Sequence, residues 1–338
     1  ISLYLESKGL NISQIGIILA AIPITSMICA PIYSRICTNP TKTKLALLIM
    51  SGIEAIFVLF MTFANSFVYF LIVIILISII SSSNYGMIDS LLTYVAEDHG
   101  KRYSSIRIYG SISYMCGVLI SGIIARYISY HALFYIACSL FFVVFILYFF
   151  ITPPVHKEEE KQKPKFKEIM QKKFFISYLI FYVLFIGTMQ VGDDFFSLYM
   201  VSKGATEYDY SLVMFGFISV EIITMILLNR FGKKLGIQIF FISLILLVVR
   251  NVIHCIPQSP LWLIITVQMV RGVIWATALF LSSTFISKIL GYEMASSGII
   301  LVLLGVQIFN SIFKFSGGYI IDLIGYPYFY MILCGISC

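Results

Sequence analysis

The sequence predicts an all-α membrane protein built from two pseudo-symmetric halves of six helices each. Three observations lead to this fold class. The 338-residue chain is 60% hydrophobic and only 12% charged, whereas soluble domains carry about 25% charged residues. Its apolar residues form runs of roughly 20, the length of a membrane-spanning helix. In addition, one eight-residue segment occurs twice along the chain.

The duplicated segment indicates that the chain contains two copies of one unit. Residues 2–9 read Ser-Leu-Tyr-Leu-Glu-Ser-Lys-Gly, and residues 197–204 read Ser-Leu-Tyr-Met-Val-Ser-Lys-Gly, at an offset of 195. The same offset relates Arg35 to Arg230. A second match, at an offset of 196, relates Tyr130, Ile136 and Cys138 to Tyr326, Ile332 and Cys334. Self-similarity at a fixed offset predicts a repeated fold.

The apolar runs give the expected elements in order. Those of the first half are Ser13–Tyr33, Lys44–Ala64, Ser66–Ala96, Ile106–Tyr127 and His131–Ile151. The polar stretch Thr152–Lys173, which holds seven lysines, is typical of a solvated linker. The runs of the second half are Phe174–Val201, Tyr208–Asn229, Leu235–Ile256, Leu261–Ile289, Met294–Tyr319 and a last run from Tyr326.

These runs divide the chain into three predicted regions. We expect an N-terminal bundle over 1–152, a cytoplasmic linker over 153–173 and a C-terminal bundle over 174–338. The second copy of the duplicated segment follows about 22 residues of apolar helix, but the first copy follows one residue. By comparison of the halves, we expect this chain to lack most of helix 1 and part of helix 12 of a twelve-helix protein.

The distribution of positive charge predicts the orientation in the membrane. Loops on the linker side, together with the span ends next to them, hold 17 of the 23 lysines and arginines, and loops on the other side hold three. Cytoplasmic loops of membrane proteins carry an excess of Lys and Arg. We therefore expect a multi-pass protein of the plasma membrane with its linker in the cytoplasm.

Ionisable residues inside the apolar runs are the candidate functional residues. Each costs about 2.5–3.5 kcal/mol on insertion scales, so such residues normally face a cavity. The set consists of Glu54, Asp89, Arg107, Asp193, Asp194, Glu221, Arg250, Arg271 and Lys314. The four histidines fall in loops or near span ends, and no Cys-x-x-Cys motif occurs. We therefore expect no metal and no cofactor.

Asp89 and Arg107 lie near the inner ends of the fourth and fifth helices. One interpretation is a charge pair that hydrogen-bonds a polar solute across this hairpin, and the other is two interfacial charges that extend to water. Tyr114 follows Arg107 by two helical turns and shares its face. Its ring could stack on a sugar or a base, or simply pack against a neighbouring helix.

Glu221 lies midway along an apolar run, where burial favours the protonated form, which makes it a candidate proton carrier. The alternative is a structural partner for Arg250 or Arg271, since neither arginine can lose its charge and each needs a carboxylate or a substrate anion. Adjacent Asp193 and Asp194 point about 100° apart on a helix. At most one of the two can face a cavity squarely.

Two further ionisable residues carry weaker signals. Glu54 is as well placed for a helix contact as for a cavity, and Lys314 can extend outward to water. A membrane enzyme is disfavoured, because the sequence offers no nucleophile–base pair, metal cluster or phosphate-binding glycine loop.

These motifs resemble the major facilitator superfamily, and within it the branch of the lactose permease and the nucleoside–proton symporters. Asp89, with Arg107 18 residues later in Arg-Ile-Tyr-Gly-Ser, is similar to the sugar-binding carboxylate and arginine of that branch. Tyr114 falls where the permease has a ring-stacking tryptophan. The basic run Asn229–Lys234 resembles the loop between helices 8 and 9, Glu221 the helix 8 glutamate and Arg250 the helix 9 arginine.

Two motifs depart from that branch. Arg271 and Ile274 occupy the positions of the permease's helix 10 histidine and proton-carrying glutamate. The loop from Arg35 to Lys44 lacks the usual aspartate of the superfamily's motif. The proton site of the permease therefore does not carry over to this chain.

The resemblance implies two six-helix bundles around a central cavity and secondary active transport of a small polar solute by alternating access. The solute would be a sugar, an oligosaccharide or a nucleoside, moved by proton-coupled symport. Solute contacts would come from Asp89, Arg107, Tyr114 and Arg271, and the proton and charge network from Glu221, Arg250, Asp193 and Asp194.

The expected partners are a small-molecule solute and membrane lipid, with no nucleic acid, and a monomer is expected. The alternatives are an efflux antiporter for amphipathic compounds and a non-transporting sensor of the same fold.

Overall fold

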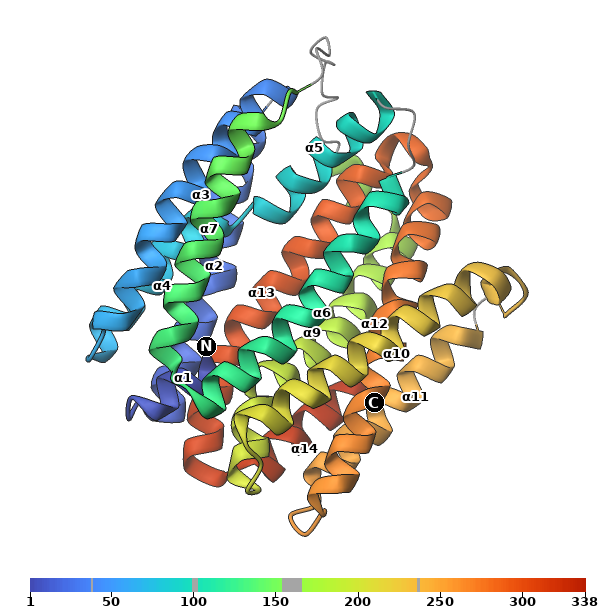
Figure 1. Ribbon diagram of the computed structural model, residues 1–338. Coiled ribbons are helices and arrows are strands. Elements are labelled where there is room, and N and C mark those ends of the chain that lie inside the picture. Colours follow the sequence, from blue (N-terminus) through green and yellow to red (C-terminus); the bar gives the residue numbers. More distant parts are fainter. Residues whose placement is uncertain (38, 99–102, 154–165, 236–237) are drawn as a thin grey trace. The chain divides into compact units, whose positions relative to one another are not determined.

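The computed structural model describes the chain except residues 38, 99–102, 154–165 and 236–237, and some helical side chains, Arg107 among them, also lie outside the described set. All the regular secondary structure in the described part is helical, as predicted (Figure 1). The chain forms two compact units, which are Ile1–Ala20 with Gln162–Cys338, and Ala21–Lys161. The predicted region boundaries at 152 and 173 stay predictions.

The unit Ala21–Lys161 is organised around one long helix. Its elements are the second part of α2 (Ile12–Ile36), then α3 (Pro40–Phe63), α4 (Phe67–Ser81), α5 (Asn84–Asp98), α6 (Tyr103–Tyr127) and α7 (Tyr130–Phe150). Helix α3 packs along α7 and also contacts α4 and α5. Asn39, Ser66 and Ser129 begin α3, α4 and α7, each with a side-chain oxygen that accepts a backbone N–H.

The run Ser66–Ala96, predicted as one continuous span, is divided into α4 and α5 at Ser82 and Ser83. The serine hydroxyls explain the division. Ser81 Oγ donates to the carbonyl of Ile77 at 2.9 Å, and Ser82 Oγ donates to a carbonyl one turn back at 3.1 Å. Such side-chain bonds compete with the helical ladder and bend helices. The two helices together still form one stretch that is long and apolar enough to span a membrane, Phe67–Thr93, as predicted.

The second unit is organised around α9. Its elements are α1 (Ser2–Ser7), the first part of α2, α8 (Phe166–Ile169), α9 (Lys173–Ser202), α10 (Glu207–Leu235), α11 (Gln238–Cys255), α12 (Leu261–Leu290), α13 (Tyr292–Ile324) and α14 (Tyr326–Ser337). Helix α9 contacts α1, α10, α12, α13 and α14. Helix α12 packs along α10 and α11, and α11 also packs along α14.

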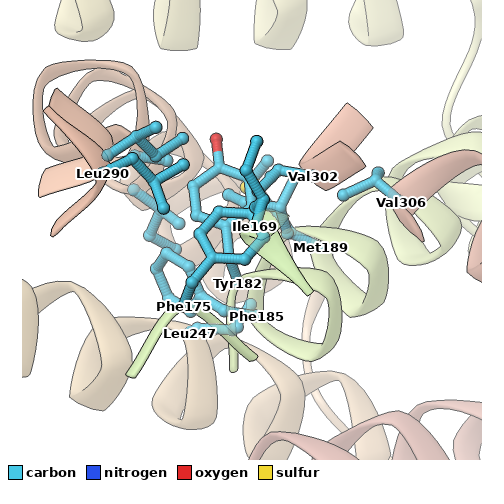
Figure 2. Close-up of a cluster of buried hydrophobic side chains, with 13 residues drawn as sticks. Ile169, Phe175, Tyr182, Phe185, Met189, Leu247, Leu290, Val302 and Val306 are labelled. Atoms are coloured by element: carbon cyan, nitrogen blue, oxygen red, sulfur yellow. The ribbon is translucent and has the colours of Figure 1, made fainter. Parts of the chain in front are cut away.

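An apolar cluster fills the middle of this unit, with buried residues from α8, α9, α11, α12 and α13. Figure 2 shows Phe175, Tyr182, Phe185 and Met189 of α9 gathered with side chains of the surrounding helices. Ile169 of α8 belongs to the cluster and is fully buried. Part of the stretch predicted as a solvated linker is therefore packed against the bundle.

The duplicated segment has the same backbone geometry in both copies. Each copy ends a helix on a glycine with positive φ, +81° at Gly9 and +87° at Gly204. Glycine is favoured there because it has no Cβ. The amide after each glycine donates to a carbonyl five residues earlier, at 3.2 Å in the first copy and 3.1 Å in the second. This hydrogen bond is that of a Schellman C-cap.

The next helix also begins in the same way in both copies. The backbone N–H of Asn11 donates to Gln14 Oε1 at 3.2 Å, and the N–H of Gln14 donates to Asn11 Oδ1 at 2.8 Å. Thr206 and Asp209, offset by the same 195 residues, form the equivalent pair at 2.8 and 3.2 Å. These reciprocal bonds are capping boxes. The repeat therefore extends past the segment where the sequences match.

The first part of α2 is anchored to α13, which explains why Ile1–Ala20 belongs to the second unit. Asp322 accepts hydrogen bonds from the N–H groups of Ile12 and Ser13, at 3.3 and 2.7 Å. A carboxylate is favourable at a helix N-terminus. One turn further, a Cβ on Gly16 would lie 2.9 Å from the Cα of Gly318. The two backbones can approach so closely only because both residues are glycines.

Within the described residues, nine helical stretches are long and apolar enough to cross a membrane. They include α2, α3, the α4–α5 stretch and α7 in one half, and α9 to α13 in the other. The apolar stretch of α6 that could be evaluated, Ile112–Tyr127, is shorter. The protein is therefore a multi-pass membrane protein, as the composition predicts.

Gly272 allows α12 to approach α10, and replacing it should separate the two helices. A Cβ at this position would lie 2.7 Å from the backbone nitrogen of Glu221 and against the carbonyl of Phe217. Gly272→Ala should lower the free energy of unfolding by about 1–3 kcal/mol, the cost of overpacking. Thermal unfolding of the purified protein in detergent measures the effect.

Gly216→Ala is the matched control at the same interface. Its Cβ would meet only the flexible end of Met269, at 2.6 Å, and alanine is the better helix former. This variant should unfold at or near the wild-type temperature. Equal losses in the two variants would contradict the backbone-contact explanation.

Candidate functional site

A network of charged and polar side chains joins α9, α11 and α12. Asp193 of α9 is its centre. Its Oδ1 accepts hydrogen bonds from Arg250 Nη2 at 2.6 Å and from Gln268 Nε2 at 3.0 Å, and its Oδ2 accepts one from Arg271 Nε. Arg250 Nε in turn donates to Gln268 Oε1 at 2.9 Å. Gln268 and Arg271 are three residues apart on α12, so they share a helix face.

The charged side chains of this network are largely buried, so water screens their charges poorly. The side chain of Arg250 is 0% exposed, that of Asp193 15% and that of Arg271 19%. Arginine stays charged at any accessible pH, so two cations share one carboxylate. Arg250 Nη1 is buried and has no hydrogen-bond partner among the described residues. The network therefore carries excess positive charge, which favours a further anionic or oxygen-rich group nearby.

The residue before Asp193 packs against Tyr330 of α14. A Cβ on Gly192 would lie 3.5 Å from Arg250 Nη2 and 3.3 Å from the ring of Tyr330. The hydroxyl of Tyr330 donates to the carbonyl of Gly192 at 2.9 Å. The Gly-Asp-Asp sequence thus places a carboxylate where α9, α11 and α14 meet.

Arg271 lies between two acids. It forms an ion pair with Asp193 and also interacts electrostatically with Glu221 of α10. Its guanidinium carbon is 4.0 Å from the centroid of the Phe217 ring, a cation–π contact. Among the described residues Glu221 forms no ion pair, so the carboxylate partner of both arginines is Asp193. Glu221 is an electrostatic neighbour of Arg271 without a direct ion pair, and its role stays a prediction.

Asp194 faces a different helix. Its carboxylate pairs with Lys314 Nζ of α13 at 2.7 Å. Lys314 is only 9% exposed, so it does not extend outward to water as the sequence suggested. One turn before this pair, Asn310 Nδ2 donates to Gln190 Oε1 at 2.6 Å. Two polar contacts four residues apart therefore join α9 to α13, and the two adjacent acids do diverge as predicted.

The predicted solute contacts of the other unit are placed only in part. Asp89 lies on α5 and is half-buried, and its backbone carbonyl accepts a hydrogen bond from Thr93 Oγ1 at 2.8 Å. Tyr114 lies on α6 and is 52% exposed. Arg107 also lies on α6, but its side chain is outside the described residues. Helices α5 and α6 contact each other, and the Asp89–Arg107 pair stays a prediction.

Sequence reasoning missed two members of buried polar contacts. Gln268, 1% exposed, was not a candidate because it carries no charge, although its spacing from Arg271 was a usable signal. Asn84 was missed for the same reason. Its Nδ2 donates to Glu54 Oε2 at 2.9 Å, and Glu54 is 3% exposed. Among the described residues, no group of three or more His, Cys, Asp or Glu side chains could hold a metal ion.

Comparison with known proteins places this site in a wider context. Residues 1–332 match the sequence model of the MFS_1 like family. The chain is 24% identical over 331 residues to the uncharacterized transporter YwbF of Bacillus subtilis (strain 168), covering 96% of this chain and 82% of that protein. It is 22% identical over 275 residues to the maltose permease of Geobacillus stearothermophilus, covering 80% and 70%.

Solved structures of the same fold are also similar. A point mutant of the nucleoside transporter NupG superposes with a TM-score of 0.86 and 17% identity, covering 99% of this chain and 91% of that one. A second structure of NupG gives a TM-score of 0.82 and 15% identity, covering 99% and 90%. Both comparisons concern the fold alone. The family match and the names of the two relatives are those of transporters rather than enzymes.

Proposed function

This chain belongs to the MFS_1 like family, and from that premise we propose that it is a secondary active transporter for a small polar solute. The solute is a sugar, an oligosaccharide or a nucleoside, and it crosses the plasma membrane by alternating access in symport with protons. Similarity to a maltose permease in sequence and to a nucleoside transporter in fold supports this class of solute. The linker side faces the cytoplasm in this proposal.

The observation that carries the proposal is the network around Asp193. Arg250 and Arg271 hold one carboxylate between them, and Arg271 also interacts with Glu221. A buried, hydrogen-bonded network of fixed cations is expensive to maintain in a membrane protein and marks a solute or ion path. Such a network offers donors to the hydroxyl or carbonyl oxygens of a polar solute.

Proton coupling follows from the way Arg271 is shared. When Asp193 or Glu221 takes a proton, Arg271 loses one of its two anionic neighbours. The guanidinium then turns to the remaining acid or to an oxygen of the solute, because it cannot shed its own charge. Binding of solute and proton is thereby linked, and the loaded protein can change its conformation around the site.

The other half supplies the remaining solute contacts in this proposal. Asp89 and Arg107 hydrogen-bond the solute, and the ring of Tyr114 stacks on its apolar face. Support comes from the resemblance of these residues to a known sugar-binding motif and from the half-buried position of Asp89 on α5.

A thermal-shift screen of the purified protein against sugars, nucleosides and small acids should identify the solute, since a ligand that binds only the folded state raises the unfolding temperature. Stabilisation by lipophilic cations alone would favour an efflux antiporter instead. Binding without counterflow of the bound solute in proteoliposomes would favour a sensor.

Glu221→Gln should retain binding of the solute found in that screen but lose uptake driven by a proton gradient, because the amide cannot take a proton. Uptake of the radiolabelled solute into proteoliposomes measures the loss. Glu207→Gln, at the start of the same helix, is the control and should transport normally. Unchanged proton-driven uptake in Glu221→Gln would remove Glu221 from the coupling mechanism.

Asp89→Ala and Arg107→Ala should each abolish the solute-induced thermal shift, because each removes a hydrogen-bonding group that contacts the solute. The exposed Asp98 at the end of the same helix gives the control, and Asp98→Ala should bind as the wild type does. If both variants bind and transport normally, the two residues are interfacial charges without a role in recognition.

A further inference from the structure

Glu54 is a buried acid that the network around Asp193 does not use. It lies on α3 with 3% of its surface exposed. Its Oε2 accepts a hydrogen bond from Asn84 Nδ2 at 2.9 Å. Asn84 is the first residue of α5, directly after the break at Ser82 and Ser83. The acid therefore lies at the point where the membrane helix is interrupted.

The surroundings of Glu54 offer no described cation. The titratable groups that interact with it are Tyr33 from α2 and Tyr148 from α7, and α5 contributes the amide of Asn84. No lysine, arginine or histidine forms an ion pair with it among the described residues. An isolated carboxylate in apolar surroundings is costly, and such a group normally neutralises by taking a proton.

The side-chain amide of Asn84 also favours a protonated Glu54. Its Oδ1 is buried and accepts no hydrogen bond in the described part of the chain. A protonated carboxyl group is complementary to a primary amide, because its C=O accepts the amide N–H and its O–H donates to the amide oxygen. An ionised Glu54 has no proton to donate, so it leaves Asn84 Oδ1 unsatisfied at a cost of about 1–3 kcal/mol.

A cavity of about 340 Å³ is lined by Tyr33 and by Ser83, the residue before Asn84. Six hydroxyl-bearing residues line it, at the end of α2, in the first turn of α3 and along the α4–α5 break: Tyr33, Ser34, Thr43, Ser82, Ser83 and Ser90. The hydroxyl groups and this volume suit several water molecules, although Ala30, Cys37 and Met87 give the cavity apolar walls as well. Tyr33 lines the cavity and interacts with Glu54, and Ser83 directly precedes Asn84.

We propose that Glu54 and Asn84 form a proton-binding site, and that the proton reaches the Glu54 carboxylate through water in this hydroxyl-lined cavity. One O–H bond forms on Glu54 as one O–H bond breaks in a hydronium ion in the cavity, which leaves a water molecule. The proton is then held by the amide oxygen of Asn84. This site requires no transported solute, so it does not rest on the proposed function.

Infrared difference spectroscopy of the full chain in lipid nanodiscs tests the site. A pH jump should reveal the carbonyl band of a buried protonated carboxyl group in the wild type, and Glu54→Gln should lose that band. Glu221→Gln is the control and should keep it. Identical difference spectra for wild type and Glu54→Gln would overturn the proposal, as would a band that responds to sodium ions at constant pH.

Asn84→Ala is a second variant that tests the same site if Glu54→Gln does not fold. This variant should retain the band but shift it to higher frequency, because the carbonyl loses the hydrogen bond from Asn84 Nδ2. An unshifted band would show that the protonated acid is not the one paired with Asn84, and the proposal would fail.

A separate substitution, Gly86→Leu, tests the route of the proton through the cavity. Gly86 lines the cavity, and a Cβ added there meets no atom within 4 Å. Gly86→Leu should therefore fill the space without a clash and slow the exchange of the Glu54 proton in D₂O, followed as a shift of its band. Gly117→Leu on α6, where a Cβ is equally unhindered, is the control. Equal exchange rates in the two variants would overturn the proposed route.

Discussion

The shared carboxylate of Asp193 is the interaction on which the second half of this protein depends. Two arginines that cannot lose their charge are kept in a largely apolar bundle, and this one acid, with the help of Gln268, compensates both. Helix α9 is fixed to α11 and α12 as a result. Gly272 belongs to the same arrangement, because it allows the close approach of α12 to the backbone of α10 at Glu221.

The contacts along α9 separate into two groups with different physical characters. Toward α11 and α12, Asp193 joins a network with excess positive charge. Toward α13, the Gln190–Asn310 and Asp194–Lys314 contacts are balanced pairs. Each of these pairs is complete in itself, whereas Arg271 lies between two acids, Asp193 and Glu221, and either acid can take a proton. This difference is why the solute and proton chemistry is proposed at Asp193 and Glu221 rather than at Asp194.

Much of the fold could be predicted, because long apolar runs identify membrane helices and because the repeated segment indicates two copies of one unit. The candidate site could be found for a related reason, since charges inside apolar runs are conspicuous. Sequence spacing does not show which face of a helix points toward its neighbours. It therefore could not predict that Asp193, rather than Glu221, forms the ion pairs with the arginines. Gln268 and Asn84 were missed because neutral amides are less conspicuous in apolar runs than charges are. The break at Ser82 was missed because serines occur in continuous helices too.

A double-mutant cycle on Asp193→Asn and Arg250→Gln, followed by thermal unfolding in detergent, tests the central claim most directly. Asp193→Asn alone should be strongly destabilising, by about 3–5 kcal/mol, because it leaves the buried arginine uncompensated. Adding Arg250→Gln should recover part of that loss, because the double variant no longer buries this unpaired charge, and the coupling energy should be at least about 1 kcal/mol. Strictly additive losses in the two single variants would contradict the claim that this carboxylate compensates the arginines.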